Sequence, residues 1–243
     1  MDLATGDAPR SFSDRVLRLL ERVEHRVATD PADRRAAFRL RCEAYQKAGF
    51  MKGAIGEIYD PLYDDDPNGW TTMTFVDGEL AGTVRINVGF DEHAVLSALE
   101  TFHDVLLPKL RARRVIIEFT RLAAKLSLSS LYPELAYVIM RPGFMAAAHF
   151  DVDFAVAAPR PEHVAFYRRT FGAEMWCAPR DYPGTTTKLP CMGADYRFRR
   201  NMIEAKSEPS ERETLFGPSR GPSSGSVRRS RAEDLSAELT NSA

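Results

Sequence analysis

Two charged residues, Glu118 and Arg121, interrupt a run that is otherwise apolar enough to form a central β-strand, Val-Ile-Ile-Glu-Phe-Thr-Arg-Leu-Ala-Ala at residues 115–124. A carboxylate in such a strand is costly unless it is paired or used for chemistry. Because successive side chains of a strand face opposite sides, positions 118 and 121 should lie on different faces unless a bulge or the strand end re-aims one of them. The pattern fits either an ion pair at a strand end or a carboxylate and a guanidinium held in place for chemistry.

Four further charged residues occur in or beside predicted elements. Arg41 lies in a predicted helix, Asp60 and Asp64 lie in a loop rich in Asp, Pro and Gly, and Arg85 lies in a predicted strand. A planar guanidinium offers two parallel donors to a carboxylate. The loop acids could therefore pair with the arginines, or they could remain solvated in an ordinary turn.

The order of the predicted elements places these residues around one sheet. Asp30 and Pro31 are a typical N-cap and first-turn proline for a helix that ends near Gly49. Asp77-Gly78, between two alternating runs, predicts a β-hairpin that carries Arg85 on its second strand. The later predicted elements are a helix or turn at 94–107, the strand at 115–124, a helix at 133–149 that Pro142-Gly143 interrupts, a strand at 151–157, a helix at 161–172, and strands at 174–177 and 192–198. This order predicts an α/β domain with a mixed sheet.

The composition divides the 243-residue chain into one domain with two flanking segments. Residues 1–22 are predicted to be an N-terminal extension with a short helix that Ser13 caps, and residues 23–203 the folded domain. From residue 204 to 243, Ser, Gly, Pro, Arg and Glu dominate and large apolar residues are few. Such a segment buries too little surface to offset its ordering entropy, so we expect a disordered tail.

The charge and cysteine content exclude several classes of function. Lys and Arg total 33 against 34 Asp and Glu, so the net charge of -1 gives no global field that would attract nucleic acid. Three cysteines without metal spacing are typical of a reducing cytosol rather than of a disulfide framework. The chain shows no signal segment and no apolar run of about 20 residues, which a membrane span would need. We therefore expect a cytoplasmic protein with no transmembrane segment and no metal site.

Four segments match, in order and spacing, the motifs of a known family. They are Arg-Cys-Glu-Ala-Tyr (41–45), Tyr-Asp-Pro-Leu-Tyr-Asp (59–64), Gly-Thr-Val-Arg-Ile (82–86) and Glu-Phe-Thr-Arg-Leu-Ala (118–123). With these segments the chain resembles the acyl-homoserine lactone (autoinducer) synthases and, more closely, the bacterial N-acyl amino acid synthases. Both have an acetyltransferase-like (GNAT) fold, so the resemblance implies a central twisted, mixed, largely antiparallel sheet flanked by helices.

The chain departs from the lactone synthases at two places. It has one extra residue between Asp60 and Asp64, and it has no counterpart of a tryptophan that follows their early helix, where Phe50 and Met51 stand instead. These differences favour the amino acid synthases.

The resemblance implies an N-acyltransferase that moves a fatty acyl group from acyl carrier protein to the amine of an amino acid. An α-amine is mostly protonated near neutral pH and must lose a proton before it attacks, so a desolvated carboxylate of raised pKa is a suitable base. Glu118 is the candidate for this role, with Arg121 beside it in the catalytic pair. Arg85 and Arg121 could clamp the acceptor's carboxylate. Arg41, Tyr45, Asp60 and Asp64 match the family's substrate-binding segments.

The same resemblance implies how the donor is bound. In this fold the pantetheine arm usually enters between the strands expected at 115–122 and 151–157, which makes the backbone N–H groups of Leu122 and Ala123 candidate oxyanion donors. The run after Arg121 lacks the glycine-rich loop that cradles the pyrophosphate of coenzyme A, which favours a carrier-protein donor and no bound cofactor. Acyl carrier protein is acidic, so Arg168 and Arg169, with Arg160 behind them, are candidates for its docking site.

Other functions remain open at the level of sequence. The alternatives are an acyl-homoserine lactone synthase, a coenzyme A-dependent GNAT N-acetyltransferase, and a non-catalytic module that binds acyl chains or carrier protein. The absence of a Gly-x-Ser-x-Gly elbow argues against a hydrolase. A lipid product could bring the protein into peripheral contact with a membrane.

Overall fold

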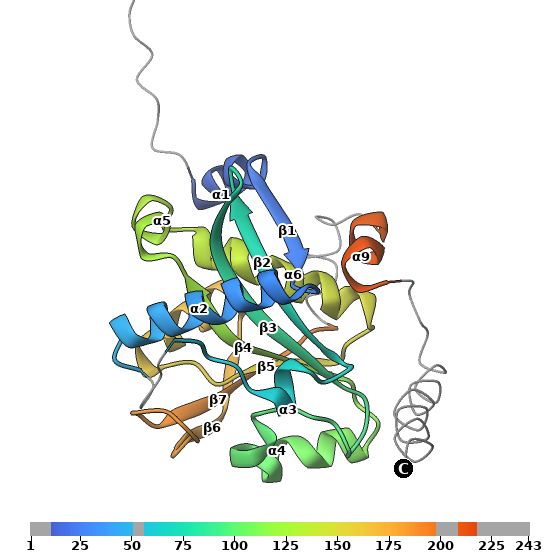
Figure 1. The fold of residues 1–243 in the computed structure, drawn as a ribbon. Coiled ribbons are helices and arrows are strands. Elements are labelled where there is room, and N and C mark those ends of the chain that lie inside the picture. The colour runs from blue at the N-terminus through green and yellow to red at the C-terminus, as the bar shows by residue number, and fades with distance from the viewer. Residues whose placement is uncertain (1–10, 51–55, 198–208, 218–243) are drawn as a thin grey trace, which may run out of the picture.

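The architecture is one seven-stranded sheet with helices on both faces (Figure 1). It is taken from a computed structural model, which describes residues 11–50, 56–197 and 209–217. The strands are β1 (Val23–Val27), β2 (Gly69–Val76), β3 (Glu79–Gly89), β4 (Ile116–Ala124), β5 (Phe154–Ala157), β6 (Glu174–Arg180) and β7 (Leu189–Asp195), in the spatial order β1-β2-β3-β4-β5-β7-β6. Only β4 and β5 pair in parallel. The predicted mixed, largely antiparallel sheet is confirmed.

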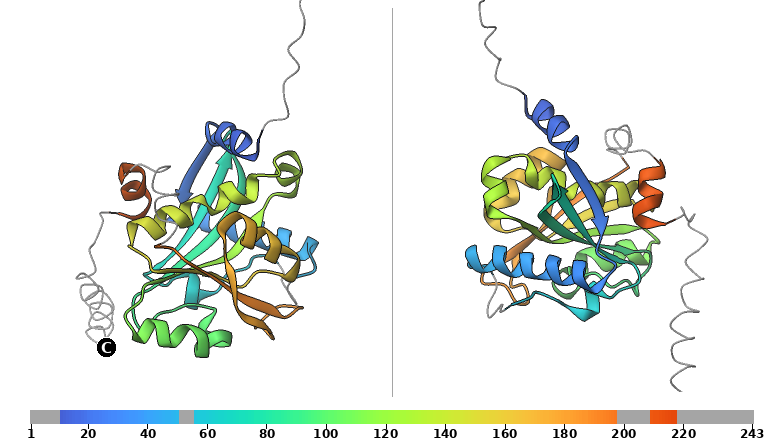
Figure 2. Two further views of the ribbon diagram at one scale, coloured as in Figure 1. Left: turned by 180° about the vertical axis from the view of Figure 1, so that it is seen from behind. Right: turned by 45° about the horizontal axis from the view of Figure 1, so that its top comes forward.

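The helices form two layers. They are α1 (Phe12–Leu20), α2 (Pro31–Lys47), α3 (Pro61–Asp64), α4 (Leu99–Arg111), α5 (Leu126–Leu131), α6 (Leu135–His149), the 3-10 turn η1 (Pro161–His163), α7 (Val164–Phe171) and α9 (Pro209–Phe216). Figure 1 shows α2 in front of the sheet, and the view from behind in Figure 2 shows α6 and α7 on the other side. None of the helices in the described ranges is long and apolar enough to cross a membrane.

Local sequence signals account for two of the predicted elements. The Asp30 side chain accepts hydrogen bonds from the backbone N–H groups of Ala32 and Asp33, so it caps α2 as predicted. Asp77 and Gly78 both have positive φ, 50° and 80°, which is the turn that joins twisted strands in a two-residue hairpin. The predicted hairpin is therefore confirmed as β2 and β3.

Two predictions about helices were wrong: the capping residue of the first helix and the interruption of the helix at 133–149. Ser11 rather than Ser13 caps α1, because its hydroxyl accepts from the backbone N–H of Asp14 while the Asp14 carboxylate accepts in return. The helix α6 also continues through Pro142, where an interruption was predicted. A proline in a helix costs about 3 kcal/mol. Burial of this helix against β3 and β4 compensates, and Gly143 fits there because the Phe119 ring occupies the space of a side chain.

The strands β4 and β5 separate part of the way along their length. They pair from Ile116–Phe154 to Phe119–Ala157, and β4 then continues to Ala124 without β5 beside it. On its other edge β4 contains a bulge, because Arg121 and Leu122 together face one residue of β3. The opening between β4 and β5 and the bulge thus occur in the same stretch of β4.

Part of the predicted disordered tail is an ordered helix. Within residues 204–243, α9 packs on α6, with Arg141 and Glu211 in a bidentate ion pair and Phe216 8 % exposed against Trp70 and Phe150. The buried ring supplies the apolar contact that the polar composition did not indicate. Residues 198–208 and 218–243 lie outside the described residues.

Candidate active site

Glu118 lies on β4 and binds the first turn of α4 from inside the protein. Its side chain is 0 % exposed. Its Oε2 accepts a hydrogen bond from the backbone N–H of Ser97 at 2.7 Å, and its Oε1 accepts from the Ser97 hydroxyl and the backbone N–H of Ala98, both at 2.8 Å. Burial raises the pKa of this carboxyl group, although Arg85 and the three donors oppose the rise. Glu118 is therefore shielded from water, and these hydrogen bonds connect it to Ser97 and Ala98.

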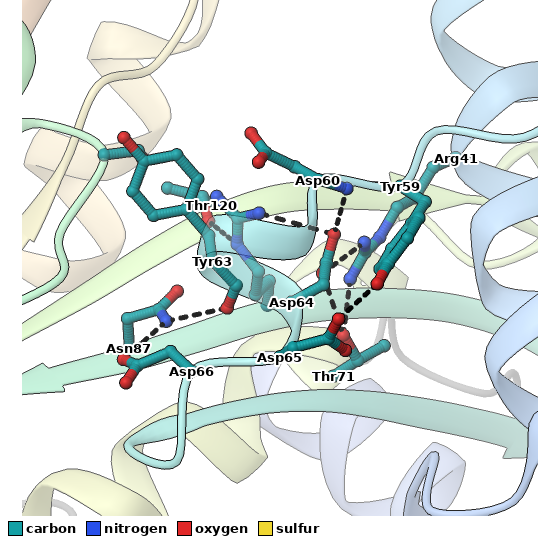
Figure 3. Close-up of polar contacts among 12 residues, drawn as sticks. Arg41, Tyr59, Asp60, Tyr63, Asp64, Asp65, Asp66, Thr71, Asn87 and Thr120 are labelled. Atoms are coloured by element: carbon teal, nitrogen blue, oxygen red, sulfur yellow. Dashed lines mark hydrogen bonds and ion pairs between the residues drawn. The ribbon is translucent and has the colours of Figure 1, made fainter. Parts of the chain in front are cut away.

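Arg41 and Asp64 form a buried ion pair that ties α2 to the α3 loop (Figure 3). Arg41 donates to Asp64 Oδ1 and to the hydroxyl of Thr71, both at 2.8 Å. Burial alone would raise the pKa of Asp64, but the Arg41 and Arg85 guanidinium groups outweigh it, so the pKa is lowered. The ionised carboxylate holds the loop against the sheet.

Asp60 does not join this ion pair. In Figure 3 its side chain points away from the arginine, and it contacts Asp64 through its backbone, whose N–H donates to Oδ2 at 2.9 Å and whose carbonyl accepts from the Asp64 N–H at 2.7 Å. The prediction that the loop acids pair with arginines is thus correct for Asp64 and wrong for Asp60. Asp60 precedes Pro61 in an extended conformation at the start of α3, which directs its side chain outward.

Arg85 is a buried guanidinium with unused donors. Its Nε donates to the Thr120 hydroxyl at 3.0 Å, and its Nη1 lies 3.5 Å from Asp64 Oδ2. The guanidinium carbon also lies 4.9 Å from the centre of the Tyr63 ring. Arg85 is 1 % exposed, yet neither Nη1 nor Nη2 has a hydrogen-bond partner among the described residues. Since buried donors without hydrogen-bond partners are costly, this guanidinium depends on the charge of Asp64 beside it and keeps donors for a further acceptor.

Arg121 occupies the bulge of β4 with φ of 54°, the left-handed region that non-glycine residues rarely adopt. The charges of Glu118, Arg121 and Arg85 all act on the hydroxyl of Tyr182, whose pKa is raised chiefly by burial. Arg121 also acts on Tyr45 of α2, where burial raises the pKa and the arginines oppose the rise. The charges of Glu118 and Arg121 thus act on the same hydroxyl. A regular strand would place the two residues on opposite faces, and the bulge re-aims one of them.

An apolar cavity of about 430 Å³ lies on the opposite face of the sheet, between the sheet, α1, α6 and α7. Its volume is typical of a small-molecule site, for which about 300–1,000 Å³ is usual. Phe119 and Ala157, the last residues paired between β4 and β5, both line it. The cavity therefore begins where the two strands separate.

The other predicted site residues lie on β4, on α7 and just before η1. Leu122 lies in the bulge and Ala123 pairs with Thr83 of β3, both beyond the last residue that β5 pairs with. Arg168 and Arg169 are exposed in the last turn of α7, and Arg169 also lines the cavity. Arg160 is already engaged, because it forms an ion pair with Glu162 and its guanidinium carbon lies 5.3 Å from the centre of the Phe50 ring.

Sequence reasoning missed three polar residues of the site: Ser97, Thr120 and Tyr182. Ser97 comes just before α4, where a serine is typical of a helix cap, but its hydroxyl donates to Glu118 instead. Tyr182 follows β6 in a loop and carries no local signal. No cluster of three or more His, Cys, Asp or Glu side chains that could hold a metal occurs among the residues described.

Comparisons with known proteins give the family. The family model for the N-acyl amino acid synthase FeeM matches residues 36–195, more than half of the chain. The solved structure of FeeM from uncultured soil microbes is similar, with a TM-score of 0.62 and 18% identity over 76% of this chain and 99% of FeeM. No protein of curated function matches the sequence.

Two other solved structures share the fold. The coenzyme A-dependent acyl-homoserine lactone synthase BjaI has a TM-score of 0.53 and 14% identity over 76% of this chain and 88% of its own. A putative N-acetyltransferase from Lactobacillus plantarum has a TM-score of 0.50 and 13% identity over 71% and 97%. The GNAT-like fold that the motifs implied is confirmed. With the family match over residues 36–195, the chain belongs to the FeeM family of N-acyl amino acid synthases and is an acyltransferase.

Proposed function

We propose that this acyltransferase moves a fatty acyl group from the thioester of acyl carrier protein to the amine of an amino acid. One observation carries the proposal. Near the place where β4 and β5 separate, after Phe119 and Ala157, an apolar cavity lies on one face of the sheet, and the buried Glu118 lies on the other with Arg85, whose Nη atoms have no hydrogen-bond partner among the described residues. A long alkyl chain needs an apolar cavity, and a zwitterionic amino acid needs a charged surface. The two must meet at the thioester carbon, where the reaction takes place.

The acceptor side fits an amino acid. The Nη donors of Arg85, which have no hydrogen-bond partner among the described residues, suit a carboxylate, for which a guanidinium provides two parallel hydrogen bonds. With the carboxylate held there, the α-amine lies on the face that Glu118 and Arg121 share. Glu118 is the base that takes the proton of the ammonium, since burial has raised its affinity for a proton. Arg41, Asp64 and Tyr45 position this surface from α2 and the α3 loop.

The cavity suits the alkyl chain better than it suits the pantetheine arm. Most of its lining side chains are apolar, among them Met140, Phe144 and Phe171, whereas pantetheine carries amide groups that would need partners. A volume of about 430 Å³ lies within the usual range of small-molecule sites, about 300–1,000 Å³. The cavity therefore has room for an acyl chain of medium to long length.

The start of α6 disfavours coenzyme A as the donor. Two helices follow β4, the six-residue α5 and the longer α6, and the start of a helix of that length could bind a pyrophosphate because free N–H groups and the helix dipole attract anions. Here Glu134, 5 % exposed, occupies the N-cap position and pairs with Arg15 of α1. This ion pair occupies the helix start where a pyrophosphate would bind, which supports a carrier-protein donor.

The reacting carbonyl would lie at the bulge. We propose that the backbone N–H groups of Leu122 and Ala123 stabilise the oxyanion of the tetrahedral intermediate, since β5 does not run beside this part of β4. Arg168 and Arg169, exposed at the edge of the cavity, would meet the acidic carrier protein.

The deciding experiment measures release of free thiol from a long-chain acyl carrier protein, with pooled amino acids as acceptors and mass spectrometry of the products. An N-acyl amino acid is expected and would identify the acceptor. Parallel reactions contain acyl-coenzyme A or a homoserine-lactone precursor. Product only with coenzyme A would overturn the donor, product only with the precursor would overturn the acceptor, and no product with any pair would overturn the proposed reaction.

A further inference from the structure

A chain of hydrogen bonds leads from a partly exposed tyrosine to the buried Glu118. The hydroxyl of Tyr182 donates to Ser97 Oγ at 3.1 Å, and the hydroxyl of Ser97 donates to Glu118 Oε1 at 2.8 Å. Each donor in the chain points toward the carboxylate. The three residues come from the loop after β6, the segment before α4, and β4, so the arrangement is a product of the tertiary fold.

Glu118 needs such a connection if it is to act on a substrate. The carboxylate is 0 % exposed, whereas Tyr182 retains exposed surface. A general base must lie within hydrogen-bond distance of the proton it removes, or reach it through one intermediate group after another. We propose that Tyr182 and Ser97 relay the proton of the acceptor's ammonium group to Glu118, with Tyr182 as the group that contacts the acceptor. This inference rests on the proposed base role of Glu118.

The proton transfers balance without any further reactant. The ammonium gives a proton to Tyr182 Oη as the Tyr182 proton passes to Ser97 Oγ and the Ser97 proton passes to Glu118 Oε1. The amine becomes neutral and free to attack the thioester carbon, Glu118 becomes a neutral carboxylic acid, and Tyr182 and Ser97 end with one proton each. After the attack the nitrogen still carries one proton more than the amide has, and this proton goes to the thiolate as it leaves. The same chain run backwards then returns the Glu118 proton through Tyr182 to water.

The charged groups around the chain favour this direction. Burial, with the charge of Glu118, raises the pKa of Tyr182, so its hydroxyl stays protonated and donates. Arg85 and Arg121 oppose that rise and stabilise negative charge that develops on the oxygen during the transfer. The titratable groups with which Glu118 or Tyr182 interacts are Tyr63 of the α3 loop, Arg85 of β3, Arg121 of β4 and Cys191 of β7.

The test is the pH dependence of turnover in Tyr182→Phe and Ser97→Ala. General acid–base groups contribute about 10²–10⁴-fold, so we expect kcat/KM for the acceptor to fall at least about 100-fold at pH 7 in either variant. The loss should shrink as the pH rises past the pKa of the acceptor's own amine, which in a free amino acid lies above the value of about 8 for a peptide α-amino group, because the base is then no longer needed. Ser97→Thr, which keeps a hydroxyl, should restore most of the activity.

The control is Ser130→Ala, which removes an exposed hydroxyl on α5 that donates to the backbone carbonyl of Leu126. It should behave as wild type at every pH. A loss in Tyr182→Phe that is the same at pH 7 and at a pH above the pKa of the acceptor's amine would mean a structural role, and an unchanged rate would mean no role; either result overturns the relay. The assay uses whichever donor and acceptor give product with the wild type, so a different donor would overturn the proposed function and leave this test intact.

Discussion

Glu118 shows, at the scale of a single residue, how a costly group is kept in a protein interior. A bare buried carboxylate would lose its hydration without compensation, but Ser97 and Ala98 supply three donors to it. The start of α4 gains as well, because two of these donors are backbone N–H groups that a helix beginning leaves without partners. The same carboxylate therefore holds the start of α4 in place and provides the site with a carboxyl group of raised pKa.

Replacing Glu118 with Gln should separate these two contributions. The amide cannot take a proton at neutral pH, so we expect turnover to fall by about 10²–10⁴-fold. It also places an NH₂ group among donors, which should lower the free energy of unfolding by about 1–3 kcal/mol and leave the fold intact. Thiol-release kinetics and urea unfolding measure the two effects, with Glu57→Gln on the surface as the control. Wild-type turnover in Glu118→Gln would remove this residue from the base role.

Arg85 provides a second prediction at this scale. Lysine keeps the charge but loses the Nε bond to Thr120 and the pair of parallel donors. Hydrogen bonds to charged groups contribute about 1.5–3 kcal/mol, so Arg85→Lys should raise the acceptor KM by about 10- to 100-fold. The KM for the acyl donor should not change, and Arg39→Lys, on the exposed side of α2, serves as the control. Equal changes in both KM values would show that Arg85 holds the fold rather than the acceptor.

At the scale of elements, the paired strands β5 and β7 line one side of the cavity. Ala155 and Ala194 are direct cross-strand partners, and both line the cavity with the smallest side chain that has a β-carbon. Ala194→Phe should fill part of the volume and shift the preferred acyl chain to a shorter length. Each methylene that no longer fits forfeits about 0.8 kcal/mol, a factor of about four in kcat/KM.

A competition assay with carrier proteins loaded with a ladder of chain lengths measures this shift. Ala165→Phe is the matched control, since Ala165 is exposed on α7 and does not line the cavity. An unchanged chain-length profile in Ala194→Phe, with the fold intact, would mean that the acyl chain lies elsewhere.

The elements differ in how far sequence could predict them. The cap at Asp30 and the turn at Asp77-Gly78 depend on neighbouring residues only, and both were predicted. Pro142 and Phe216 depend on tertiary burial, which outweighs the local preference for a break or for disorder. The site divides in the same way. Glu118 was evident as a charge in an apolar run. Its partner Ser97 lies 21 residues away in the sequence, and Tyr182, which binds Ser97, lies 85 residues from Ser97. Only the tertiary fold brings these three residues together.

At the scale of the whole molecule, a near-zero net charge leaves recognition of an acidic partner to local patches. Arg168 and Arg169 are exposed beside the cavity on α7. Replacing both with Glu should raise the KM for acyl carrier protein by about 10-fold or more and weaken its dependence on salt, because steering acts mainly on association. The acceptor KM should stay the same, and Arg39→Glu controls for the change in total charge. An unchanged KM for the carrier protein would exclude this patch.

The stability of the whole domain should depend on pH through His25, which joins the edge strand β1 to the rest of the sheet. Its Nδ1 lies 3.2 Å from the Thr74 hydroxyl, and its Nε2 is buried without a hydrogen-bond partner among the described residues. Burial, with the charge of Arg141, lowers the pKa of His25 to about 3, and Glu211 opposes this. In the unfolded chain the pKa is about 6.5. Between these two values the unfolded chain binds one proton more than the folded domain, so stability falls as the pH falls.

Comparison of wild type with His25→Gln isolates this contribution from that of the paired carboxylates, which also lose stability in acid. The His25 contribution should be constant above pH 7 and should then decrease by about 1.4 kcal/mol for each pH unit below about 6.5, down to about pH 3. Urea unfolding at a series of pH values measures the difference in the free energy of unfolding between the two proteins. A difference that stays constant from pH 8 to pH 4 would mean that His25 is protonated as readily in the folded domain as in the unfolded chain. In that case β1 would have to open to water at this position, and the ion pair between Arg141 and Glu211 beside it would not shield the ring.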